Sequence, residues 1–120
     1  MLYNCKCVYK AQTMVNISSS QSVLTLINTF EVEADKCDDL LALLIEATEQ
    51  VMRHIDGFVS ANFHRSLDGK HIANYAQWTS KEAFDAMLEN EEAQVHMRAA
   101  AQLATSFSPI LYNVVRSEEA

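Results

Sequence analysis

Residues 57–78 read GFVSANFHRSLDGKHIANYAQW and have the pattern of a β-hairpin. Two runs rich in β-branched and aromatic residues flank Asp68-Gly69, a dipeptide that favours positive φ in a tight turn. With these two residues as the loop, Leu67 pairs with Lys70 and Phe63 pairs with Asn74. Because side chains alternate along a strand, one face of the hairpin then carries a mostly apolar set: Val59, Ala61, Phe63, Arg65, Ile72, Asn74, Ala76 and Trp78.

Asn74 is a polar exception on this apolar face. A buried amide needs hydrogen-bond partners, so either the fold or a bound ligand must satisfy it. Trp78 follows four residues later on the same face, and it is interpreted either as a core anchor of a central strand or as a ligand contact. The hairpin alone leaves both alternatives open.

Length and charge exclude several classes of protein. The chain has 120 residues and a formal net charge of −7, which predicts one domain and argues against nucleic acid or an anionic membrane as a partner. The longest purely apolar run, residues 40–45, is far too short for a membrane span, and the N-terminus has no apolar signal segment. The three cysteines fit a reducing compartment. We therefore expect a cytoplasmic protein.

The first 21 residues are predicted to be a flexible leader that ends in a serine-rich link. The domain then spans residues 22–117, and residues 118–120 form a short tail. Met14 is an alternative start residue. Cys5 and Cys7 bring two thiolates together without further ligands, so we expect no metal site there.

The remaining elements follow from hydrophobic periodicity. Residues 23–32 are predicted to be a central strand, with Asn28 as the one polar side chain on its apolar face. At Asn28 a satisfied sheet amide and a pocket residue remain alternatives. A helix capped by Asp35 is predicted over residues 35–54. A second helix follows a Thr79–Glu82 capping box. A third is predicted over residues 91–104, with Val95, Ala99 and Leu103 facing inward. Pro109 opens a last strand at Ile110–Arg116.

The resulting order, β-α-β-β-α-β, predicts an α+β, ferredoxin-like fold with helices on one face of an antiparallel sheet. The other face would still carry leucine, isoleucine, valine and tryptophan side chains. A large exposed apolar face marks an interface, so we expect a homodimer. A cavity between sheet and helices is expected where the core is incompletely filled.

Four segments together resemble the antibiotic biosynthesis monooxygenase family: residues 56–64, 68–69, 73–78 and 80–84. Within it, the chain is similar to the small cofactor-free oxygenases that turn a phenol of an aromatic polyketide into a quinone, as in actinorhodin assembly. The resemblance covers residues 23–116 and implies homodimers of ferredoxin-like subunits that form a dimeric α/β barrel.

The resemblance also implies a site. It places Asn74, Trp78, His64 and Arg98 among the catalytic residues, and we expect five more positions to bind substrate: Asn28, Phe63, Phe84, Met87 and His96. Phe63 and Phe84 stand where the polyketide oxygenases have tyrosines, so the substrate or the proton route must differ. Strict alternation puts His64 on the face opposite Asn74, and a bulge or another turn register would reconcile the two placements.

The implied activity is a cofactor-independent monooxygenation of a phenolic or hydroquinone-type aromatic by O₂. The electrons would come from the substrate itself. Asn74 and the indole N–H of Trp78 would hold a phenolate oxygen, and Arg98 would stabilise it or the peroxide that follows. His64 or His96 would move the proton.

Two other functions remain open. Haem-degrading monooxygenases have the same fold and resemble this chain at Asn28 and near His96, but Met87 stands where they have a tryptophan. A dimer that binds a small molecule without chemistry is the other alternative, because two missing tyrosines are what a lapsed active site would show.

Overall fold

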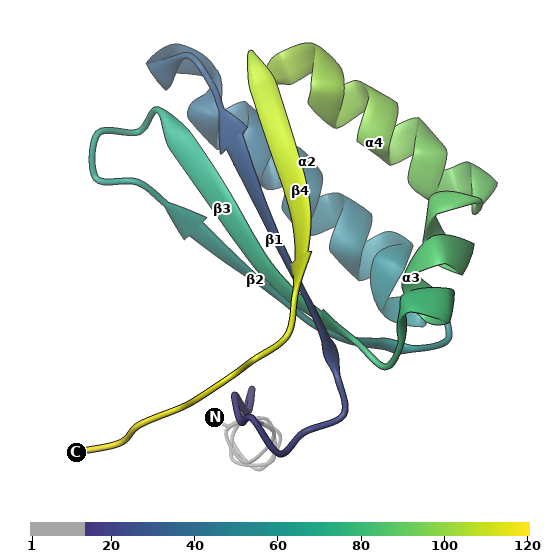
Figure 1. The fold of residues 1–120 in the computed structure, drawn as a ribbon. Helices are drawn as coiled ribbons and strands as arrows, with labels where there is room; N and C mark the ends of the chain where they lie inside the picture. Colours follow the sequence, from purple (N-terminus) through teal and green to yellow (C-terminus); the bar gives the residue numbers. More distant parts are fainter. Residues whose placement is uncertain (1–13) are drawn as a thin grey trace, which may run out of the picture.

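The computed structural model describes residues 14–120, so Cys5, Cys7 and the first part of the expected leader lie outside the described range. The order of elements confirms the predicted α+β pattern, with the second helical segment divided in two (Figure 1). The elements are β1 (Leu24–Glu31), η1 (Ala34–Lys36), α2 (Cys37–Gln50), η2 (Met52–His54), β2 (Phe58–Arg65), β3 (His71–Trp78), α3 (Lys81–Leu88), α4 (Glu91–Leu103) and β4 (Ser106–Tyr112).

The four strands form one antiparallel sheet in the order β2-β3-β1-β4. Helices α2, α3 and α4 all lie on the same side of it (Figure 1). Strand β1 is internal, as its pattern predicted, and it buries Leu26 and Phe30 toward the helices. None of the helices in the described range is long and apolar enough to cross a bilayer.

The hairpin register is the predicted one, because Phe63 pairs with Asn74. The loop is wider than predicted. The ladder ends at Arg65 and Ile72, and the Gly69 N–H donates to the Ser66 carbonyl at 3.0 Å, so Leu67 and Lys70 belong to the loop. Gly69 has a φ of 73°, which a residue without Cβ adopts at little cost.

A β-bulge between Phe58 and Ser60 changes the start of β2. Phe58 pairs with Trp78 and turns toward the helices, whereas Val59 is 44% exposed. The expectation that Val59 shares the apolar face is therefore wrong. An extra residue in one strand reverses the alternation on its N-terminal side and leaves the C-terminal side unchanged.

Helix α2 begins two residues later than predicted. Asp35 lies in the preceding 3₁₀ turn, and Lys36 occupies the N-cap without a side-chain hydrogen bond, so the predicted cap is wrong. The predicted apolar stripe is confirmed, since Cys37, Leu40 and Ala47 are buried against the sheet.

The two later helices begin at polar caps. The side chain of Ser80, rather than the predicted Thr79, accepts from the Ala83 N–H at 3.1 Å, and Asn90 accepts from the Ala93 N–H at 2.9 Å. These interactions satisfy N–H groups that the helix leaves free. The predicted inward stripe of α4 is wrong at Val95, which is 56% exposed, and the buried residues are Ala93 and Ala100. Leu103, the last residue of that stripe, does pack against the core.

Strand β4 starts at Ser106, so Pro109 lies inside it and does not open it. Proline lacks an N–H, and an edge strand tolerates it because one side needs no partner. Residue alternation along β4 points Phe107, Pro109 and Leu111 toward the helices and Ile110 and Tyr112 away from them.

The sheet face away from the helices is more polar than predicted, and Trp78 does not belong to it. Thr25 and Gln77 are buried on this outer face. The Gln77 side-chain N–H donates to the Asn16 carbonyl at 2.8 Å, so the end of the expected leader contacts β3.

Candidate functional site

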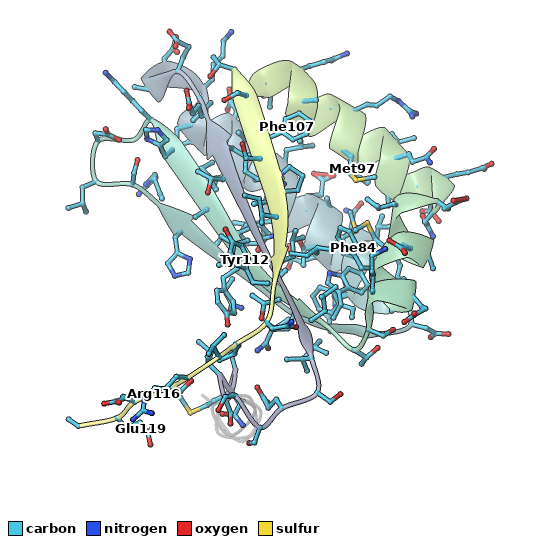
Figure 2. All side chains as sticks on the ribbon, viewed as in Figure 1. Phe84, Met97, Phe107, Tyr112, Arg116 and Glu119 are labelled. Atoms are coloured by element: carbon cyan, nitrogen blue, oxygen red, sulfur yellow. The ribbon has the colours of Figure 1, made fainter. Side chains whose placement is uncertain are left out.

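A cavity of about 400 Å³ lies between the sheet and the three α-helices. Figure 2 shows Phe84 and Met97 reaching from α3 and α4 into this space, with Phe107 between β4 and α4. Leu88 and Phe107 are 41% and 49% exposed, and Ala101 and Pro109 are exposed too, so these four residues form the mouth. The wall is mainly apolar, and its polar side chains are those of Asn28, Thr48, Asn74, Trp78 and His96.

Two asparagines form the floor of the cavity. Asn28 on β1 and Asn74 on β3 are directly opposite each other in the ladder, which brings their Cβ atoms to roughly 5 Å. The Asn74 Oδ1 accepts from the Asn62 backbone N–H at 3.2 Å. The fold thus satisfies the oxygen of Asn74 and leaves its side-chain NH₂ as a donor for a bound molecule.

Asn28 differs because its Oδ1 is buried and has no hydrogen-bond partner within residues 14–120. Leaving such an acceptor unsatisfied costs about 1–3 kcal/mol. Its neighbours on β1, Leu26 and Phe30, are apolar and also line the cavity. A ligand hydroxyl is the kind of group that would satisfy it, so the floor offers one acceptor and one donor side by side.

Trp78 forms the aromatic end of the cavity. It is 2% exposed and meets Phe58 and Phe84 edge-on, with ring centroids 5.5 Å and 6.4 Å away. Edge-to-face packing of this kind holds an indole in one orientation. No hydrogen bond within residues 14–120 uses the Trp78 N–H, which remains a donor for a ligand.

The helical side of the cavity carries two further polar groups. The Thr48 hydroxyl on α2 donates to the Leu44 carbonyl at 2.9 Å. His96 on α4 is half-buried and takes part in no hydrogen bond or ion pair among residues 14–120. That part of the chain also contains no cluster of histidine, cysteine and acidic side chains able to hold a metal ion.

The structure gathers seven of the nine expected site residues around one cavity. They are Asn28, Phe63, Asn74, Trp78, Phe84, Met87 and His96. His64 lies on the outer face beside Asn62 and Tyr75, and Arg98 is exposed on the far side of α4, so neither is part of this wall. The bulge at Phe58–Ser60 precedes His64 and does not turn it around.

Sequence reasoning missed Phe58 and Thr48 as lining residues. Phe58 could not have been found, because the bulge that turns it inward has no clear signature in the sequence. Thr48 follows Leu44 by four residues on the predicted apolar stripe, and this spacing was the available signal.

Comparison with known proteins agrees with the fold. The sequence model of the antibiotic biosynthesis monooxygenase family matches residues 23–99. Tetracenomycin-F1 monooxygenase from Streptomyces glaucescens is 45% identical over 83 residues, which are 69% of this chain and 74% of that protein.

Two solved structures share the fold. A variant of SnoaB, a cofactor-independent oxygenase from Streptomyces nogalater, has a TM-score of 0.72 and 20% identity, covering 80% of this chain and 96% of that one. The ActVA-Orf6 monooxygenase of Streptomyces coelicolor, in complex with nanaomycin D, has a TM-score of 0.71 and 24% identity, covering 81% and 91%. The resemblance noted in residues 56–84 is thus confirmed: the chain belongs to the antibiotic biosynthesis monooxygenase family.

Proposed function

We propose that this protein is a cofactor-independent monooxygenase that oxidises a phenolic or hydroquinone-type, polyketide-like aromatic to a quinone with O₂. The 45% identical relative is a tetracenomycin-F1 monooxygenase, and a neighbour of the same fold is a cofactor-independent oxygenase. The observation that carries the proposal is the floor of the apolar cavity. There Asn28, whose buried oxygen has no hydrogen-bond partner among residues 14–120, lies directly opposite Asn74 in the ladder.

The floor suits an aromatic ring with hydroxyl groups. A substrate hydroxyl donates to Asn28 Oδ1, and a phenolate oxygen accepts from the NH₂ of Asn74 or the N–H of Trp78. The surrounding apolar wall excludes water, and donors held rigidly in such a site stabilise developing negative charge more strongly than water does.

The substrate supplies the electrons. One phenol and one O₂ give one quinone and one water: one oxygen atom becomes the new carbonyl and the other leaves as water. The ionised ring reduces O₂, so the task of the protein is to favour the ionised ring and to protect the oxygen adduct from solvent. Neither His64 nor Arg98 reaches the cavity, and we give them no part in this scheme.

Oxygen uptake tests the proposal. Purified protein without added cofactor should consume O₂ with 1,5-dihydroxynaphthalene or a tricyclic anthrone and form the coloured quinone. With ¹⁸O₂, the product should gain one labelled oxygen. No uptake across this panel, although the same compounds bind anaerobically, would instead support a binding protein without chemistry.

Haem degradation is the second candidate, because Asn28 and His96 line the same cavity. Titration with hemin distinguishes haem degradation from cofactor-independent oxygenation. A Soret band that Asn28→Ala and His96→Ala weaken, followed by loss of the band with a reductant and O₂, would favour haem. An unchanged hemin spectrum would exclude it.

A further inference from the structure

The cavity wall raises the question of which group takes the proton from the substrate. Amides and an indole N–H do not accept protons near neutral pH. Phenylalanines stand at both positions where the resemblance expects tyrosines, Phe63 and Phe84. Among residues 14–120, no acidic, lysine, arginine, tyrosine or cysteine side chain lines the cavity. His96 is therefore the one titratable group in the described wall.

His96 is placed to accept a proton and to pass it on. It projects from α4, across the cavity from the asparagine floor on β1 and β3. Neither ring nitrogen is engaged by another described residue, so one can face the substrate. The His96 side chain is only half-buried, so it is in reach of solvent, which gives the proton a route out of the cavity.

We propose that His96 is the general base of the reaction, an inference that rests on the proposed function. Its imidazole takes the proton of a substrate hydroxyl as that O–H bond breaks, and the phenolate gives electrons to O₂ as a ring C–O bond forms. The imidazolium then protonates the peroxide. The ring C–H proton then leaves as the O–O bond breaks, and the carbonyl forms at that carbon. The departing hydroxide takes up this proton as water, so that one substrate and one O₂ give one quinone and one water.

His96→Gln tests this role because glutamine keeps the size and polarity of the side chain without its basicity. With 1,5-dihydroxynaphthalene, kcat should fall by about 10²–10⁴-fold, the usual contribution of a general base. The deficit should shrink with ring-halogenated analogues, whose hydroxyl groups are more acidic and need less help to ionise. Added imidazole should restore part of the activity of His96→Gly.

Binding is measured separately from chemistry. The chain has a single tryptophan, Trp78, and it lines the cavity, so its fluorescence reports a bound aromatic under anaerobic conditions. The Kd of His96→Gln should stay within about threefold of the wild-type value. His71→Gln is the matched control, because His71 is exposed at the start of β3, and it should leave both kcat and Kd unchanged.

The outcomes are separable. His96 is not the base if His96→Gln loses no kcat, or if it loses the same factor with every halogenated analogue, while quenching of Trp78 fluorescence shows that the analogues still bind. If His96→Gln does not fold, His96→Asn and the imidazole rescue of His96→Gly decide the same question. A failure of imidazole to restore activity to His96→Gly would overturn the proposed role. No turnover by the wild-type protein with any of these compounds would contradict the proposed oxygenation itself.

Discussion

Asn28 and Asn74 are the same amino acid on neighbouring strands, yet their side chains relate to the fold differently. The Asn74 oxygen accepts from the Asn62 backbone N–H, whereas the buried Asn28 oxygen has no hydrogen-bond partner in the described part of the chain. One amide therefore contributes to the stability of the sheet, and the other lowers it. At the scale of the residue, the Asn74 oxygen serves the fold, whereas the Asn28 oxygen and the Asn74 NH₂ are left for a ligand.

Replacement of each asparagine should have opposite effects on stability. Asn28→Leu removes an unsatisfied buried amide and should raise the free energy of unfolding by about 1 kcal/mol, while turnover is lost. Asn74→Ala removes the hydrogen bond to Asn62 and should lower it by about 1 kcal/mol, also with loss of turnover. Urea denaturation and oxygen uptake measure both, and a less stable Asn28→Leu would show that the amide supports the fold.

Alternation was enough to place Asn74, Trp78 and Phe63 on one face and His64 on the other. Alternation could not show that the Asn28 oxygen lacks a hydrogen-bond partner among the described residues, because that depends on every side chain around it. Arg98 was expected only from the resemblance, and the rotation of α4, set by packing, leaves it exposed.

At the scale of the element, Gly57 joins the start of β2 to the start of α3. Its carbonyl accepts from the Thr79 N–H at 2.8 Å, and its φ is 91°. A Cβ at this position would overlap the Cβ of Ala83 and come within 2.8 Å of the Thr79 hydroxyl. The close approach requires glycine, and it fixes the end of β3 that carries Trp78.

The two glycines with positive φ therefore make a matched pair. The added methyl group of Gly69→Ala faces open space, so this change should lower the free energy of unfolding by about 1–2 kcal/mol, from the left-handed conformation alone. Gly57→Ala adds the steric overlap with Ala83, so it should lower the free energy of unfolding by more than Gly69→Ala does. It should also change the fluorescence of Trp78. Thermal unfolding compares the two, and equal losses would contradict the close packing of Gly57 against α3.

The hairpin loop should respond to acid. The Ser66 hydroxyl and the Lys70 backbone N–H donate to the Asp68 carboxylate and hold its pKa below the ordinary value of 3.8. The charged form is thus favoured in the folded state, so its contribution to stability is present above pH 3.8 and is lost as the pH falls through the lower folded value. The stability difference between wild type and Asp68→Asn should be constant near neutral pH and should shrink below 3.8.

Element boundaries show where sequence patterns fail. The stripe of α2 predicted its buried face because packing follows a regular spacing. The start of α2, the cap of α3 and the limits of β4 were off by one to four residues, because several polar residues near each end can serve as caps and only the tertiary contacts choose among them.

At the scale of the whole molecule, the described residues leave the edge strand β4 and the part of the outer sheet face beside it exposed. Ile110 and Tyr112 are 49% and 43% exposed there, and Tyr112 points away from the helices (Figure 2). Exposed apolar side chains next to an unpaired strand edge favour association. We expect a homodimer that uses this face.

Sedimentation of the purified protein tests that expectation. The wild type should have twice the mass of one chain at micromolar concentration, and Ile110→Lys should shift it toward the monomer. Val95→Lys is the control, because Val95 is 56% exposed on α4, away from the sheet. A wild type that stays monomeric would contradict the expected dimer.

The mouth of the cavity has a consequence for how activity depends on assembly. Phe107 and Pro109 border the entrance and belong to β4, which has one edge without a neighbouring strand in the described part of the chain. Dimerisation along β4 and entry of substrate would then involve the same part of the surface. A second subunit bound there would narrow or reshape the entrance of the cavity. Specific activity should therefore vary with dilution, even where every catalytic side chain stays in place.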